Sequence, residues 1–191
     1  MPEVFEDDII NCLAVLKKGG IILYPTDTVW GIGCDATNAH AVQKVFDIKK
    51  REQSSALIVL LADKKDILKY VAAPDLQVFD FLYEQTRPTT IVFENAIGLP
   101  DNLVARDGSI AIRVVKDPFC IHLIKRFRKP LVSTSANLHG EETPALFKNI
   151  SLEVQQRVEY IVKWKKESEE KTQPSQIVKW NKNGTTTIIR S

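Results

Sequence analysis

The sequence has few cysteines and histidines and no long apolar run. Its 191 residues include only three cysteines, odd in number and far apart (Cys12, Cys34 and Cys120). That usage argues against a disulfide framework and indicates a reducing compartment. The N-terminus, Met1-Pro-Glu-Val-Phe-Glu-Asp-Asp, is acidic, unlike a signal or transit peptide, and no apolar run approaches the length of a membrane span. We therefore expect a cytoplasmic protein without a membrane partner.

Several cofactor and catalytic signatures are also missing. The three histidines are scattered, with no cysteine or histidine spacing suited to zinc, so no protein-bound zinc or other metal site is expected. Neither a phosphate-binding G-x-x-x-x-G-K-[ST] loop nor a G-x-S-x-G nucleophile elbow occurs. Gly31-x-Gly33-x-x-Ala36 matches a loose dinucleotide fingerprint, but the next helix is expected to start only near Asn38. NAD is therefore not expected.

The charges nearly balance, with 26 lysines and arginines against 24 acids and a net charge of +2. Nothing like a polybasic arm is present, so any anion must be bound by local basic groups. With 44% hydrophobic residues the chain can bury one sizeable core. In the absence of a repeat, a low-complexity segment or a linker, we expect one domain over residues 1–191.

Hydrophobic periodicity predicts that helices and strands alternate along the chain. The first helix is expected to carry Phe5, with Gly19 as its C-terminal cap, and the helix opened by Pro74 to bury Leu76, Phe79 and Leu82 or Tyr83. The region 163–171 reads as a solvated charged run. Further helices are predicted at 38–50, 64–71, 117–127 and 151–162, and strands at 21–24, 57–61, 89–93, 109–115, 129–137, 176–180 and 185–190, the last two forming a hairpin around Asn183-Gly184.

Two of the predicted strands end in small polar residues. Residues 21–24 break at Pro25 into Thr26, Asp27 and Thr28, where a buried strand reaches the surface. Residues 129–137 end in Ser133-Thr-Ser-Ala-Asn137. Polar side chains at such strand ends commonly meet a ligand, although a turn that stabilises its own backbone is an equal alternative for 26–28.

Strand alternation groups these polar side chains. Ser109, Ala111 and Arg113 share one strand face, as do Ser133, Ser135 and Asn137. The basic pair Lys49-x-Arg51 closes a helix, where basic residues often only offset the helix dipole. Cations, hydroxyls and amides together are nevertheless the ingredients of a phosphate site.

Taken together, these residues resemble the YrdC-like threonylcarbamoyl-AMP synthases. The resemblance extends from about residue 8 to residue 190 and includes the K-x-R and S-x-N pairs that mark the active branch of the family. The motifs occur in order at compatible spacing: Tyr24-Pro-Thr-Asp-Thr-Val-Trp-Gly-Ile, Lys49-x-Arg51, Arg87-Pro-Thr-Thr-Ile-Val, Ile110-Ala-Ile-Arg113 and Ser133-Thr-Ser-Ala-Asn137-x-x-Gly.

The resemblance implies an α/β (α+β) fold, with a twisted mixed parallel and antiparallel sheet, flanking helices and a concave basic pocket. It implies an enzyme that joins L-threonine, bicarbonate and ATP, with Mg²⁺ on the phosphates, into L-threonylcarbamoyl-adenylate and pyrophosphate. A downstream threonylcarbamoyl transferase would use this product to modify tRNA. Longer members of the family carry a second C-terminal domain, which is not expected here.

The resemblance also assigns roles residue by residue. Lys49 and Arg51 would be the catalytic pair. Threonine would be bound by Thr28, Arg113, Ser133 and Ser175, and ATP by Arg51, Ser55, Ser109, Ser135, Asn137, Thr143 and Arg190.

The chain departs from the family pattern after the basic pair. Lys50, Glu52 and Ser54-Ser55-Ala56 stand where Gly, Pro and a Lys/Asn-Pro-Leu step are usual, so this loop is expected to differ in shape. Trp30 replaces a commoner tyrosine and Gln176 a usual threonine. Two other functions stay open at this point. One is a module of the same fold that binds tRNA or double-stranded RNA without chemistry, and the other is a paralogue acting on another acceptor.

Overall fold

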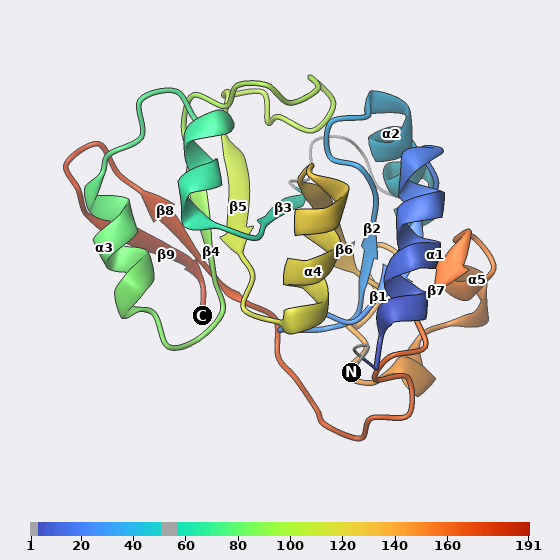
Figure 1. Cartoon of the computed structure of the whole chain (residues 1–191). Coiled ribbons are helices and arrows are strands. Elements are labelled where there is room, and N and C mark those ends of the chain that lie inside the picture. The colour runs from blue at the N-terminus through green and yellow to red at the C-terminus, as the bar shows by residue number, and fades with distance from the viewer. Residues whose placement is uncertain (1–3, 51–56) are drawn as a thin grey trace.

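The computed structural model describes residues 4–50 and 57–191 and is organised around one nine-stranded sheet (Figure 1). The strand order is β7-β1-β2-β6-β3-β5-β4-β8-β9. The strands are β1 (Ile22–Tyr24), β2 (Gly31–Gly33), β3 (Ile58–Leu61), β4 (Thr89–Phe93), β5 (Ile110–Val114), β6 (Leu131–Ser135), β7 (Tyr160–Ile161), β8 (Gln176–Trp180) and β9 (Thr186–Arg190).

The sheet is mixed, as the resemblance implied. The pairs β1–β7, β3–β5 and β4–β8 are parallel, and the other neighbouring strands are antiparallel. The helical elements are α1 (Glu6–Lys17), α2 (Ala39–Lys49), η1 (Lys64–Lys69), α3 (Gln77–Glu84), α4 (Pro118–Phe127), η2 (Phe147–Asn149) and α5 (Leu152–Gln155). No helix among the described residues is long and apolar enough to cross a membrane.

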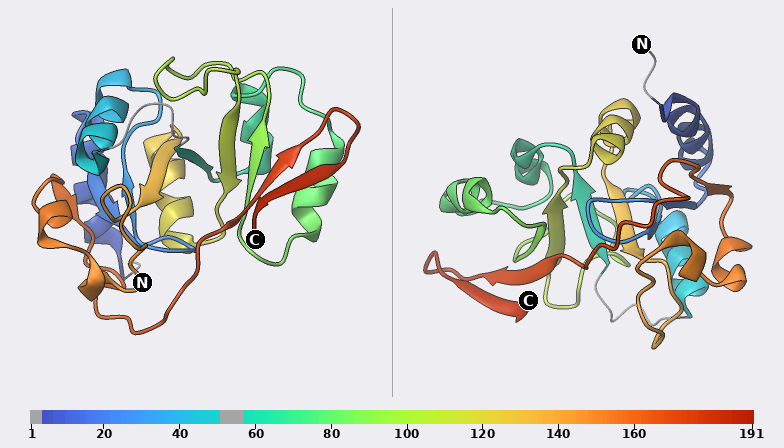
Figure 2. Two further views of the ribbon diagram at one scale, coloured as in Figure 1. Left: turned by 180° about the vertical axis from the view of Figure 1, so that it is seen from behind. Right: turned by 90° about the horizontal axis from the view of Figure 1, so that it is seen from below.

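Helices cover one face of the sheet and leave much of the other open. Figure 2 shows α1, α3 and α4 along the same side. On β5, the side chains of Ile110 and Ile112 are buried in the core, whereas Ala111 and Arg113, of the opposite parity, line a cavity. The open face is therefore where the site-bearing side chains emerge.

The ends of three helices are capped, and the Gly19 cap was predicted. Oδ1 of Asn38 accepts hydrogen bonds from the backbone N–H groups of His40 and Ala41, and the Asp117 carboxylate accepts one from Cys120. Gly19 takes a positive φ of 69° just past α1. The C-terminal hairpin is also confirmed, as β8 and β9 pair across Asn183-Gly184.

The predicted helix at 151–162 is mostly wrong. Only Leu152–Gln155 is helical, and Tyr160–Ile161 pairs in parallel with β1. The carbonyl groups of Ile21, just before β1, and of Leu23 on β1 accept hydrogen bonds from the N–H groups of Glu159 and Val162. These backbone donors are therefore used by the sheet edge and are not available to a helix.

The first residues of the charged segment 163–171, which was predicted to be solvated, are attached to the rest of the fold. The buried Asp8 carboxylate, on α1, accepts hydrogen bonds from the Lys163 N–H at 3.0 Å, the Trp164 N–H at 2.8 Å and the Tyr160 hydroxyl at 2.7 Å. Lys165 forms an ion pair with Asp117 at 3.1 Å. These contacts tie the segment to α1 and α4.

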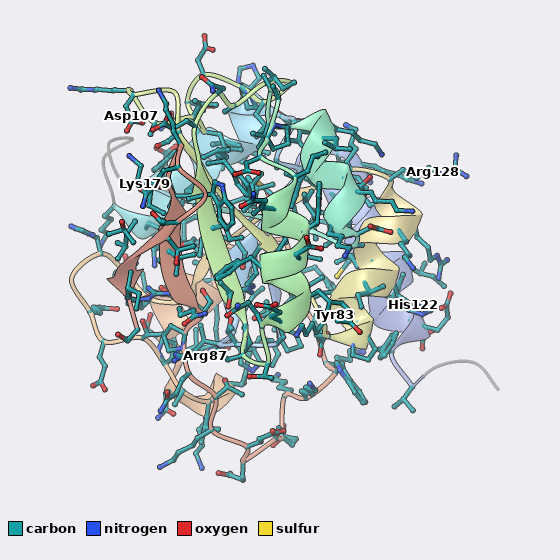
Figure 3. All side chains as sticks on the ribbon, turned by 90° about the vertical axis from the view of Figure 1, so that its left-hand side faces the viewer. Tyr83, Arg87, Asp107, His122, Arg128 and Lys179 are labelled. Carbon is teal, nitrogen blue, oxygen red and sulfur yellow. The ribbon has the colours of Figure 1, made fainter. Side chains whose placement is uncertain are left out.

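The inward face of α3 was predicted only in part. Phe79 and Leu82 are partly buried and pack against the core as predicted, but the fully buried residue of the helix is Val78. Leu76 and Tyr83 are 66% and 85% exposed. Figure 3 shows where Tyr83 lies. The helix begins at Gln77 rather than near Pro74, so Leu76 lies outside it at the N-cap position.

Candidate active site on the open face of the sheet

A cavity of about 490 Å³ lies on the open face and is lined by side chains from six strands. A volume of this size suits a small-molecule ligand. The cavity brings together eight residues predicted from the sequence as threonine or ATP contacts: Thr28, Ser109, Arg113, Ser133, Ser135, Thr143, Ser175 and Arg190.

Strand parity and register explain this convergence. Arg113 lies opposite Leu60 of β3 and Thr90 of β4, in the middle of the sheet. Ser135 lies opposite Gly31, and Ser133 opposite Ile58. Side chains that alternate along one strand thus meet those of the neighbouring strands on the same face.

Arg113 is buried at 3% exposure and held from one side. Its Nη2 lies 3.2 Å from Oδ1 of Asp27, an ion pair without the alignment of a hydrogen bond, and donates to Oγ1 of Thr26 at 3.4 Å. Oδ2 of Asp27 accepts the backbone N–H of Lys116 at 3.2 Å. The buried Nε of Arg113 has no hydrogen-bond partner among the described residues, so it can donate to a ligand carboxylate.

The hydroxyls of Thr26 and Thr28 form a directed pair. Thr26 donates its proton to the carbonyl oxygen of Val29 at 2.8 Å. The two hydroxyl oxygens are 2.9 Å apart, so Thr28 must be the donor in their bond. The Thr28 oxygen, which lines the cavity, is left as an acceptor for a ligand amine or hydroxyl.

Ser175 and Arg190 form the far wall of the cavity. The hydroxyl of the buried Ser175 forms a hydrogen bond with the Thr90 hydroxyl at 2.8 Å. The backbone carbonyl of Ser175 accepts hydrogen bonds from Nη2 of Arg190 at 2.8 Å and from its Nε at 3.2 Å. Burial, followed by the charge of Arg113, lowers the pKa of Arg190 below its usual value. The two guanidinium groups therefore repel each other, and an anion in the cavity would offset this repulsion.

Lys49 and Asn137 do not line the cavity but lie behind it. The ammonium of Lys49 donates to the Ser135 carbonyl at 2.6 Å and to Oδ1 of Asn137 at 3.0 Å. Nδ2 of Asn137 donates to the carbonyls of Leu138 and Glu141. Lys49 thus contacts both members of the S-x-N pair at the end of β6. Arg51 and Ser55 lie outside the described residues.

The sequence did not single out three of the polar groups at the site. Lys179 of β8 and Asp107 of the loop before β5 line the cavity, and Figure 3 shows them at the same end of the molecule. Hydrogen bonds from Ser109 lower the pKa of the Asp107 carboxyl. Alternation along the predicted strand 176–180 could have assigned Lys179 to one face of the sheet, but only the pairing of β8 with β4 shows that this face is the open one. Thr90 is recognised as part of the site only through its hydrogen bond with Ser175.

The described lining carries Arg113, Lys179 and Arg190 against the single carboxylate of Asp107. A cavity with this charge, hydroxyl groups and an apolar wall of Ile58, Val92 and Ile177 can bind an anion attached to an apolar group. Over residues 4–50 and 57–191, no three His, Cys, Asp or Glu side chains gather as a metal site would require.

Comparison with known proteins places this geometry in context. The Sua5/YciO/YrdC family model, described as "Telomere recombination", matches residues 14–191. A protein of Pseudoalteromonas translucida named threonylcarbamoyl-AMP synthase is 38% identical over 137 residues, covering 70% of this chain and 72% of the relative.

Solved structures show the same fold. P. abyssi Sua5 complexed with L-threonine superposes with a TM-score of 0.83 at 19% identity, covering 95% of this chain and 53% of Sua5. E. coli YciO superposes with a TM-score of 0.83 at 20% identity, covering 97% of this chain and 89% of YciO. This chain thus spans about half the length of Sua5 and most of YciO.

Proposed function

Because the chain belongs to the Sua5/YciO/YrdC family, we propose that it is a threonylcarbamoyl-AMP synthase. It joins L-threonine, bicarbonate and ATP into L-threonylcarbamoyl-adenylate and releases pyrophosphate. The observation that carries the proposal is the single cavity that holds Arg113, Thr28 and Ser133 together with Ser109 and Arg190. One pocket thus offers groups for an amino acid beside groups for a nucleotide.

The amino acid would be held at the Arg113 end. Nε of Arg113 would donate to the threonine carboxylate, because this buried donor has no partner among the described residues. The Thr28 oxygen would accept a hydrogen bond from the threonine amine or hydroxyl, since its own hydroxyl group donates a hydrogen bond to Thr26. The family motifs also assign Ser133 and Ser175, which line the same cavity, to threonine.

The nucleotide would extend toward Ser109, Ser135, Thr143 and Arg190. Lys49, Asn137, Arg51 and Ser55 are assigned to this part of the reaction by the family motifs. Mg²⁺ would arrive on the ATP phosphates, as is usual for Mg²⁺ in ATP-dependent enzymes.

The chemistry is an adenylyl transfer, which makes the enzyme a nucleotidyltransferase. The threonine amine and bicarbonate give a carbamate with loss of water. The carbamate oxygen then attacks the α-phosphorus of ATP, and the bond from that phosphorus to the bridging oxygen of pyrophosphate breaks. The side chains orient the reactants and neutralise charge, as is general for displacements at phosphorus. A downstream transferase would pass the threonylcarbamoyl group to tRNA.

Pyrophosphate release measured with and without threonine and bicarbonate tests the proposal, with mass spectrometry of the adenylate product. Arg113→Ala should lose this activity, while Arg157→Ala, which removes a surface arginine paired with Glu153, should keep it. Salt-dependent RNA binding without threonine-dependent ATP consumption would instead support the RNA-binding alternative, which the naming of the relatives does not favour.

A further inference from the structure

Gly31 lies on the floor of the cavity, beside Ser133. It pairs with Tyr24 of β1 and Ser135 of β6 and has no positive φ, so its backbone would accept any residue. A Cβ atom built on Gly31 would lie 2.8 Å from Oγ of Ser133, closer than real Cβ atoms approach. The next nearest atoms, at 3.4 and 3.8 Å, are at ordinary contact distance.

Gly33, two residues along the same strand, presents a different obstacle. A Cβ there would lie 2.5 Å from Cε1 of the fully buried Tyr24 ring and 2.6 Å from the Val132 carbonyl oxygen. Neither group can move without disturbing the core or the sheet. At Gly31 the only close atom is a hydroxyl on a rotatable side chain, so the fold itself does not require glycine there.

The Ser133 hydroxyl lies at the wall of the cavity in the present arrangement. Ser133 lines the cavity together with Gly31 and Thr28, and the neighbouring Tyr24 donates its phenolic hydrogen to the Val132 carbonyl at 3.2 Å. A hydroxyl oxygen has two lone pairs, so in this rotamer the Ser133 oxygen can accept a hydrogen bond from an ammonium or hydroxyl group in the cavity.

We infer that Gly31 is a positioning residue that keeps the Ser133 oxygen directed at the amino-acid substrate. A methyl group at position 31 would turn the Ser133 hydroxyl to another rotamer and remove the acceptor, with the fold retained. The inference rests on the proposed function and deepens it. The substrate group recognised at Ser133 is the protonated amine or the hydroxyl of a small hydroxylated amino acid.

A double-mutant cycle on Gly31→Ala and Ser133→Ala tests this inference. Each single change should raise the KM for threonine by about tenfold, the equivalent of one lost hydrogen bond in a closed site, with the KM for ATP within about twofold. The double variant should be no worse than Ser133→Ala alone, since Gly31 acts through Ser133. Additive losses, or an unchanged threonine KM in Gly31→Ala, would overturn the inference.

Two further measurements separate this inference from its alternatives. Gly31→Ala should melt close to the wild type, whereas Gly33→Ala should melt far below it; a Gly31→Ala protein that does not fold would show that the glycine is structural. A crystal structure of Gly31→Ala should show a rotated Ser133, and an unmoved hydroxyl would refute the inference even for an active enzyme. A wild type without threonine-dependent pyrophosphate release counts against the proposed function alone, because the rotamer can still be determined.

Discussion

The ammonium of Lys49 lies 3.0 Å from Oδ1 of Asn137, although the two residues are 88 positions apart in the chain. Lys49 is 2% exposed at the end of α2, and its carbonyl accepts the backbone N–H of His139 at 2.9 Å. Its Nζ also donates to the carbonyl of Ser135. Lys49 thus fixes the loop that follows β6, and with it the placement of the Ser135 hydroxyl in the cavity.

Lys49→Met should therefore weaken both the fold and nucleotide binding. Removing the ammonium leaves buried acceptors unpaired, so we expect a loss of about 3 kcal/mol in the free energy of unfolding. The KM for ATP should rise because Ser135 loses its support. Urea unfolding and pyrophosphate release measure the two effects. Lys50→Met, whose half-exposed ion pair with Glu153 contributes little, serves as the control. Wild-type stability in Lys49→Met would contradict this role.

Asp27 should matter for threonine and not for ATP. Its carboxylate holds the Arg113 guanidinium and the Lys116 backbone N–H, so Asp27→Asn removes the charge while keeping the shape. We expect the threonine KM to rise about tenfold as Arg113 loses its anchor. Asp107→Asn, at the opposite end of the cavity, should leave the threonine KM unchanged. If both variants shift the same constant, Asp27 does not act through Arg113.

Strand alternation is local and predicted part of the cavity lining, whereas Thr28, Thr143, Ser175 and Arg190 were assigned to substrates only through the family resemblance. Ser109 and Arg113 share a face by parity alone, and the structure brings them into one cavity. The strand β2 was not predicted because two of its three residues are glycines, which have low β propensity. It forms between β1 and β6, which supply hydrogen-bonding partners on both sides. The contact of Lys49 with Asn137 likewise depends on how α2 and β6 are packed, which no local pattern encodes.

The stability of the protein should fall above about pH 8.5 because its thiols are buried. Burial is the main cause that raises the pKa of Cys12, Cys34 and Cys120. The unfolded chain releases these protons near pH 8.5 while the native state keeps them, so alkaline pH favours unfolding. Each thiol should contribute a slope of about 1.4 kcal/mol per pH unit above that point.

Urea unfolding at pH 7 to 10 measures this slope. Cys12→Ala should be less stable at pH 7 but show a shallower decline, by roughly one thiol's share. Tyr83→Phe, which changes an exposed phenol, should leave the decline unchanged. An identical slope in Cys12→Ala and the wild type would mean that another group controls the alkaline limit.

Arg190 should bind the phosphate groups of a nucleotide in the cavity. Its guanidinium donates a hydrogen bond to the Ser175 carbonyl. Burial and the charge of Arg113 lower the pKa of Arg190, but the side chain remains charged at neutral pH. Inorganic pyrophosphate, placed between the two guanidinium groups, would relieve their repulsion and raise the melting temperature of the wild type. Arg190→Gln should lose most of this shift and raise the KM for ATP about tenfold, with the threonine KM changed much less. Arg157→Gln, a surface change, should keep the full pyrophosphate shift. An equal shift in Arg190→Gln and the wild type would show that pyrophosphate binds elsewhere.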